Sequence, residues 1–202
     1  MIAKPIKDIF KDMTQEISTE LLDQLQLVDL VITGVHFMAG HPLEIVNRLI
    51  ERGENGKEFD KYPLIALFMD YPEIYSDRVG LMETKLHLMI CRGTSPSLIT
   101  DERFEANFLP ILYPIYEALK KKIHTFSYGR NGKPFQTIEV NQIEHTKIDR
   151  PFWGRETFLA NKANAHTDYI DAIEIRDLKL LINLTKSKRP KIVHCHRSQK
   201  IK

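Results

Sequence analysis

Apolar residues in the middle of the chain are spaced in a way that predicts two strands followed by a helix. Residues 62–69 form a nearly continuous apolar run, which is typical of a strand that is covered on both faces and lies inside its sheet. Residues 80–91 alternate between apolar and polar positions, the period of a strand with one buried face. From about Asp101 to His124 the apolar residues recur every three or four positions, so this segment is predicted to be a helix.

The N-terminal part of the chain predicts a long helix, a strand and a short helix. An apolar stripe over residues 4–27 indicates one helix, or two if Ser18 and Thr19 mark a second start. Residues 28–37 are rich in apolar and β-branched side chains and are predicted to form a strand. Pro42 suits the first turn of a helix that ends near Gly53.

The C-terminal part predicts strands separated by a hairpin and a long loop. Asn131–Gly132 is a strong hairpin signal if it lies between paired strands, and residues 135–145 are predicted to be a strand. Residues 146–167 have no clear period and are predicted to be a loop. In the last predicted strand, residues 169–184, the apolar positions switch from odd to even numbers at Asp177. A regular strand would then turn one half the wrong way, so a bulge or bend is predicted at Asp177.

Length and composition favour one domain, alone or with arms. The chain has 202 residues, of which 43% are hydrophobic, enough for a real core. No run approaches the roughly 18 apolar residues that cross a bilayer, and the N-terminus lacks the apolar stretch of a signal peptide. Cys91 lies in a predicted strand and Cys195 in a polar stretch, so we expect no disulfide and a protein made in a reducing compartment.

Basic charge is concentrated at the C-terminus. Residues 186–202 contain seven Lys or Arg residues and no Asp or Glu; without these seven, the 29 basic residues fall to 22 against 27 acidic ones. Such a tail is either a solvated terminus or a contact with nucleic acid or an acidic protein surface. The candidate contact residues are Lys188, Arg189, Lys191 and Arg197, of which the arginines can bind carboxylates bidentately.

The sequence contains no evident catalytic constellation. It has no phosphate-binding glycine loop, no nucleophile elbow and no HExxH motif. His194, Cys195 and His196 are adjacent, but no second ligand pair lies at zinc-finger spacing, so no metal site is predicted. His36 and His41 flank a predicted turn and are interpreted as ordinary turn histidines. We therefore predict that the chain is not an enzyme and uses no cofactor.

One segment of the predicted long loop has the composition of a protein interface. The chain's only Trp, Trp153, lies beside Phe152 and between Arg150 and Arg155, in a stretch that is otherwise polar. Trp and Arg are enriched in interface hot spots, and aromatic residues in interfaces generally. The alternative is that Phe152 and Trp153 fold back onto the monomer's own core. The length of the loop favours the interface.

Three stretches give the chain a resemblance to tail-terminator and tail-completion proteins of tailed bacteriophages. They are Tyr62–Phe68, Asp101–Pro114, and Lys147–Gly154 together with Asp168–Ile175. In these stretches and in the order of its elements, the chain resembles proteins of phages and prophages from Bacteroidetes-type hosts. The resemblance covers about residues 60–185. The first 60 residues and the basic tail depart from it, because the members of the family are shorter.

The resemblance implies an α+β fold, with a twisted, mostly antiparallel sheet packed by helices. It divides the chain into an N-terminal extension of helix and strand at 1–60, a tail-terminator-like core at 61–185 with a long loop at 146–167, and the basic tail at 186–202.

The resemblance also implies a structural virion protein. Such a protein forms a homo-oligomeric ring in the neck or tail, at head–tail joining or tail completion, and is assembled in the host cytoplasm. Rings arise when heterologous contacts close on themselves. The expected partners are portal, connector or tail proteins, with transient contact to channel DNA and none to a membrane. The alternative is a nucleic-acid-binding or nuclease-accessory protein that uses the basic tail, and a metal-dependent enzyme is a distant third.

The interface interpretation of Trp153 leads to a direct test. Trp153→Ala should weaken assembly and leave the monomer's melting temperature almost unchanged, as measured by sedimentation and by thermal unfolding. A fall of many degrees would instead place the ring in the core, because removing a buried Trp costs about 3–5 kcal/mol.

Overall fold

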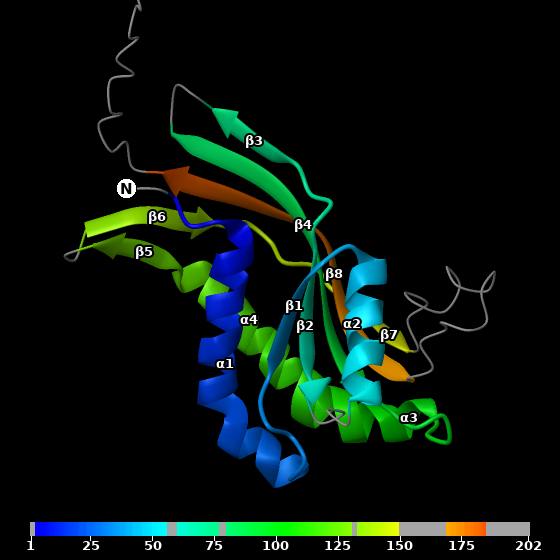
Figure 1. The fold of residues 1–202 in the computed structure, drawn as a ribbon. Coiled ribbons are helices and arrows are strands. Elements are labelled where there is room, and N and C mark those ends of the chain that lie inside the picture. The colour runs from blue at the N-terminus through cyan, green and yellow to red at the C-terminus, as the bar shows by residue number, and fades with distance from the viewer. Residues whose placement is uncertain (1–2, 56–59, 77–79, 131–132, 150–168, 185–202) are drawn as a thin grey trace, which may run out of the picture.

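Two long antiparallel strands, β4 and β8, form the centre of an eight-stranded sheet that curls around a layer of helices (Figure 1). The computed structural model describes residues 3–55, 60–76, 80–130, 133–149 and 169–184. The strands are β1 (His36–Gly40), β2 (Leu64–Phe68), β3 (Glu73–Ser76), β4 (Leu81–Gly93), β5 (Ser127–Arg130), β6 (Lys133–Glu139), β7 (Thr146–Asp149) and β8 (Ile170–Leu184).

The order of the sheet is β1-β2-β4-β8-β6-β5, with β3 added to β4 and β7 added to β8. Strands β2 and β3 follow one another along the same edge of β4, while β6 and β7 lie along the far edge of β8. Only the β1–β2 pair is parallel among the described strand pairs. The α+β class with a mostly antiparallel sheet is therefore confirmed.

Helices cover the two faces of the sheet unequally (Figure 1). They are α1 (Ile6–Val28), α2 (Pro42–Glu54), α3 (Thr100–Arg103), the π-helix η2 (Phe104–Leu112) and α4 (Tyr113–Thr125). The larger core lies between α1, η2 and α4 and one face of the sheet. A smaller core lies under α2 on the opposite face, against β1, β2 and the adjoining ends of β4 and β8.

The central strands agree with the apolar pattern. Every residue of β2 is buried, with Ile65 and Leu67 in the larger core and Leu64 and Ala66 in the smaller one. The prediction of an inner strand at 62–69 is thus confirmed. The half-buried strand predicted at 80–91 is right for the first part of β4 only, because α2 covers the second part.

The helix predicted over 101–124 is present but contains a π-helical segment, η2, in its middle. Pro110 and Pro114 both lack an N–H and would clash with the preceding turn of a regular α-helix. The wider π geometry lets the Tyr113 N–H donate to the Phe108 carbonyl, five residues back. Proline placement therefore explains why one periodic segment is built in three pieces.

The N-terminal elements correct two predictions. Helix α1 is continuous, so Ser18 and Thr19 do not start a second helix. The strand predicted at 28–37 is wrong for most of its length, because the chain turns after Val28 and β1 begins only at His36. Ser18 helps set this path: its hydroxyl accepts the Val35 N–H at 2.9 Å, and a Cβ on Gly34 would lie 2.6 Å from the same oxygen.

The remaining strands are short, and the sequence predicted only some of them. The hairpin predicted around Asn131–Gly132 is confirmed by β5 and β6, although residues 131–132 lie outside the described part. The strand predicted at 135–145 ends at Glu139, and β7 occupies the start of the predicted loop. Strand β3 was not predicted, because residues 70–78 are rich in turn formers. A four-residue edge strand that pairs only with β4 carries too little periodicity to be recognised.

The irregularity predicted at Asp177 is confirmed. Residue Leu86 faces Leu178 and Leu88 faces Ile175, so His87 lies opposite both Arg176 and Asp177. Asp177 has φ of 51°, in the left-handed region. This bulge keeps apolar residues on the larger core along all of β8.

Two substitutions at Asp177 should change the free energy of unfolding by different amounts. Asp177→Gly should leave the free energy of unfolding within about 0.5 kcal/mol of the parent, because glycine adopts φ near +50° freely but also gains freedom in the unfolded chain. Asp177→Val should lose about 1–2 kcal/mol, since a β-branched residue is strained there. Urea unfolding measures both, with Lys179→Val as the control at an exposed position on the same strand. Equal losses for the glycine and valine variants would contradict the left-handed bulge.

Candidate functional site

Apolar side chains are exposed on the last turn of α1 and on the residues that follow it. We call Leu27–Val31 the apolar turn. Leu27 is 89% exposed and Leu30 88%, while Val28 and Val31 are 45% and 52% exposed. Single exposed apolar residues are ordinary on a protein surface, but four within five positions form a contiguous patch of the kind that marks an interaction site. The turn lies at the C-terminal end of α1, the opposite end of the molecule from the β3–β4 and β5–β6 hairpins (Figure 1).

The main chain of the apolar turn is held by hydrogen bonds centred on Asp29. The Asp29 N–H donates to the Leu25 carbonyl at 3.0 Å, and the Asp29 carboxylate accepts the Val31 N–H at 3.0 Å. The Ile32 N–H donates to the Asp29 carbonyl at 3.1 Å. Leu25 and Ile32, on either side, are fully buried. The exposure of the apolar side chains is therefore fixed by an ordered turn with buried ends.

An ion pair ties the apolar turn to the sheet. Arg92, near the end of β4, binds the second carboxylate oxygen of Asp29. The Val31 N–H bond, and to a lesser extent Arg92, lower the pKa of the Asp29 carboxyl, against the opposing effect of burial. Gln26 adds a bond from its side-chain amide to the Ile32 carbonyl at 3.1 Å. The turn is thus positioned by the central strand and not by α1 alone.

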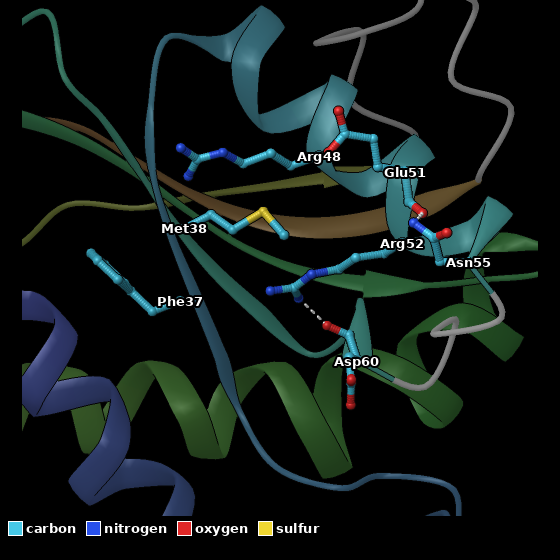
Figure 2. Close-up of a pocket in the computed structure, with 7 residues that line it drawn as sticks. All are labelled: Phe37, Met38, Arg48, Glu51, Arg52, Asn55 and Asp60. Atoms are coloured by element: carbon cyan, nitrogen blue, oxygen red, sulfur yellow. Dashed lines mark hydrogen bonds between the residues drawn. The ribbon is translucent and has the colours of Figure 1, made fainter.

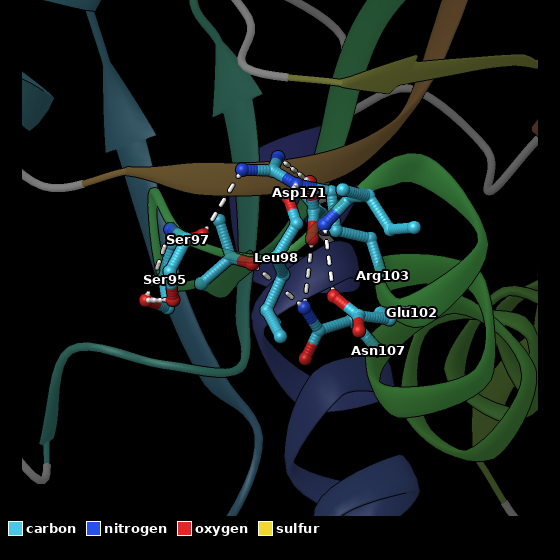
Figure 3. Close-up of polar contacts among 9 residues, drawn as sticks. Ser95, Ser97, Leu98, Glu102, Arg103, Asn107 and Asp171 are labelled. Carbon is cyan, nitrogen blue, oxygen red and sulfur yellow. Dashed lines mark hydrogen bonds and ion pairs between the residues drawn. The ribbon is translucent and has the colours of Figure 1, made fainter.

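A second polar cluster, around Arg103, is buried and fully paired (Figure 3). Arg103 is 1% exposed and donates to the Leu98 and Ser95 carbonyls at 2.9 and 3.1 Å. It forms an ion pair with Asp171 at 2.8 Å, and Asn107 donates to the other oxygen of that carboxylate at 2.7 Å. Each strong donor and acceptor has a partner, so the cluster fastens the β4–α3 connection to β8 and leaves no group for chemistry.

A third cluster lies at the bulge of β8. The Glu174 carboxylate, 4% exposed, binds His87 Nε2 at 2.7 Å and Arg176 Nε at 2.8 Å. The His87 ring lies 4.5 Å from the Phe68 ring. The Arg176 guanidinium and the His87 ring provide partners for a carboxylate that would otherwise be buried alone. This arrangement explains how the bulge tolerates Glu174 beside the smaller core.

A pocket of about 330 Å³ opens between α2 and β1 (Figure 2). Its lining residues are Phe37, Met38, Arg48, Glu51, Arg52, Asn55 and Asp60. Arg48 pairs with Glu44, one turn earlier on α2, and Arg52 donates to the Asp60 main-chain carbonyl. Among the described residues, the lining offers guanidinium and carboxylate groups and an amide.

Two further candidate groups for chemistry lie in the described part of the chain, Cys91 and His41. Burial raises the pKa of the Cys91 thiol well above its ordinary value, so this thiol is a poor nucleophile. His41 accepts the Leu43 N–H at 3.2 Å and caps α2, in agreement with its interpretation as a turn histidine. Within the described residues, no group of three His, Cys, Asp or Glu side chains could hold a metal ion. That the chain is not an enzyme stays a prediction.

The interface residues predicted from the sequence lie outside the described part of the chain. This holds for the loop residues Arg150, Phe152, Trp153 and Arg155 and for the tail residues Lys188, Arg189, Lys191 and Arg197. The apolar turn was not predicted as a site, because its β-branched residues were assigned to a strand. One signal could have revealed it: Asp29 interrupts the apolar run, and Asp is common in turns and rare in buried strands.

No family model matches this chain, and no curated protein matches it. Among the described helices, none is long and apolar enough to span a membrane.

The pKa of Asp29 leads to a test of the turn's anchor. A lowered pKa in the folded state means that the ionised carboxylate stabilises the fold at neutral pH and that this contribution is lost as pH falls through the lowered value. Relative to Asp29→Asn, the parent should therefore lose about 0.5–1 kcal/mol between pH 7 and pH 3, a modest value because the pair is partly exposed. Urea unfolding at both pH values gives the difference, and an identical difference at both would contradict the ion pair.

Proposed function

We propose that this chain is a non-catalytic ring subunit of the neck or tail of a tailed bacteriophage. The observation that carries the proposal is the apolar turn, whose side chains are exposed while its main chain is anchored to β4. The apolar turn supports a protein that assembles with others. The resemblance of residues 60–185 to tail-terminator and tail-completion proteins supports the phage neck or tail as the assembly.

The energetics favour an interface at the apolar turn. Burying one Leu side chain contributes about 1.5–3 kcal/mol of favourable free energy. Neither Leu27 nor Leu30 makes this contribution while it faces water. A partner that covers the turn recovers that free energy without having to order its main chain, because the Asp29 bonds already do so. Pre-organised apolar residues of this kind are what a stable contact requires.

The shape of the molecule also suits a ring. The apolar turn lies at one end, and two hairpins lie at the other (Figure 1). Contacts between unlike ends are heterologous, and heterologous contacts form a ring where the rotation closes and an open filament where it does not. In this proposal the protein is assembled in the host cytoplasm and resides in the virion, where its partners are portal, connector or tail proteins. It needs no cofactor.

A second candidate function rests on the separation of charge in the sequence. The basic residues of 186–202 could bind nucleic acid, in which case affinity would be independent of sequence and would fall steeply with salt through counterion release. Deleting residues 186–202 would then reduce DNA binding and leave assembly unchanged. A loss of assembly without a loss of DNA binding favours the ring subunit.

The most economical experiment is mass spectrometry of purified virions from the phage or prophage that encodes the chain. The proposal requires the protein in the particle, in several copies for each portal ring. Its absence from the virion would rule the proposal out.

A paired substitution tests the apolar turn itself. Leu27→Ser together with Leu30→Ser should leave the melting temperature within a few degrees, because both side chains are almost fully exposed. The same change should abolish ring or virion assembly, counted as tailed particles in the electron microscope. Ile99→Ser with Leu109→Ser is the matched control, since these residues are 64% and 53% exposed elsewhere on the surface. Equal effects of the two double variants would refute a specific interface at the turn.

A further inference from the structure

Strand β3 is an exposed edge of the sheet. It pairs only with β4 among the described strands, and all four of its residues are exposed. Ile74 is 61% exposed and Tyr75 60%, with Met69 just before them at 41%. Proteins usually protect such an edge from other chains with charge, bulges or a covering segment. Here the edge offers apolar side chains on both faces.

The main chain of β3 has free hydrogen-bonding groups. The Gly80 N–H donates to the Ser76 carbonyl at 3.2 Å, so Ser76 faces β4. Because antiparallel strands alternate, the main-chain groups of Glu73 and Tyr75 point away from β4. A pocket of about 200 Å³ adjoins this edge and is lined by Glu73 and Tyr75 together with residues 3–6, Met82, Gln136 and Leu184. An added strand would find both backbone partners and a place for a side chain.

The charge of this edge is negative. The described residues of this edge, from Asp70 to Ser76, contain two carboxylate side chains, Asp70 and Glu73, and no Lys or Arg. Asp77 and Arg78 follow in the sequence. Within the described residues, neither Asp70 nor Glu73 takes part in an ion pair; Glu73 accepts a hydrogen bond from the Tyr75 hydroxyl at 2.9 Å. Burial, that bond and the charge of Glu73 together raise the pKa of Tyr75. A partner segment that carries Lys or Arg residues would neutralise this edge.

The chain itself contains a segment of that chemistry. Residues 186–202 carry seven basic residues and no acid, with Ile192 and Val193 among them. The chain continues for 18 residues past Leu184, and an extended segment of that length reaches about 60 Å. The Leu184 N–H donates to the Gly80 carbonyl at 2.7 Å, so the tail leaves the fold beside the β3–β4 hairpin.

The topology favours the tail of another copy over the chain's own tail. Strand β8 pairs with one edge of β4 and β3 pairs with the other, so β4 separates the end of β8 from the free edge of β3. The chain's own tail would have to reverse its direction around the end of the β3–β4 hairpin to reach that edge, whereas a neighbour's tail approaches it from outside. We propose that residues 186–202 of one copy bind along the acidic edge strand β3 of the next copy by strand addition. This inference rests on the proposed assembly of copies and names one of the contacts.

Disulfide trapping between full-length chains tests the contact. One chain carries Ser76→Cys, at the end of β3, together with Cys195→Ser. The other chain keeps Cys195, or carries Ile192→Cys with Cys195→Ser. Cys91 is fully buried and does not compete. The matched control chain carries Asp23→Cys with Cys195→Ser, at an exposed position of α1.

The expected result is a cross-linked dimer of the two chains, at least fivefold more abundant than with the control. Adding Glu73→Lys to the Ser76→Cys chain, or raising the salt concentration, should reduce that yield severalfold. Yields equal to the control at both tail positions would overturn the inference. So would a chain carrying both cysteines that cross-links only within itself, since the tail would then bind its own edge.

The outcome is separable from that of the proposed function. Trapping reports a contact between two chains and does not require a closed ring. A protein that cross-links as expected but is absent from virions would keep the tail contact and lose the ring assignment. A virion ring whose chains fail to cross-link would do the reverse.

Discussion

The pairing of β4 with β8 is the constraint on which the rest of the structure depends. These two strands run the length of the sheet, and every other strand except β1 and β5 pairs directly with one of them. Because the bulge at Asp177 restores the correct side-chain direction, both halves of β8 present apolar residues to α1, η2 and α4. Arg92 and Asp171, which lie opposite each other in this pair, then anchor the apolar turn and the β4–α3 connection.

Periodicity predicted the elements that are long or buried on both faces. The inner strand β2 and the bulge at Asp177 follow from the spacing of apolar residues, because each position that faces a core requires an apolar side chain. The same reasoning failed where tertiary contacts override local preference. Val28 and Val31 favour a strand, but Val28 ends α1. The hydrogen bond from the Val31 N–H to Asp29 and the ion pair from Arg92 to Asp29 hold the following residues in a turn. That partner is 63 positions away in the sequence, so no local pattern could have revealed it.

The described residues combine buried ionic clusters that are paired within the chain with apolar side chains that are exposed to solvent. The buried ionic groups at Arg103 and Glu174 are satisfied by partners within the chain, as structural ion pairs are. The apolar turn and β3, in contrast, expose groups that would be stabilised by contact with another molecule. Among the described residues, Thr84 Oγ1 and Arg92 Nε are buried side-chain atoms without a hydrogen-bond partner, while the two buried ionic clusters are paired within the chain. The exposed apolar side chains are the groups on which we base the proposal of assembly. The apolar turn and β3 are both distinct from the segments that were predicted as interfaces from composition.

Electron cryomicroscopy of the intact virion neck would show directly whether this chain is a ring subunit. We expect a ring of identical copies in which the fold of β4, β8 and α1 is recognisable and the Leu27–Val31 turn is covered by a neighbouring subunit or an adjoining ring. A map in which this fold is absent, or in which the turn faces solvent in every copy, would contradict the account.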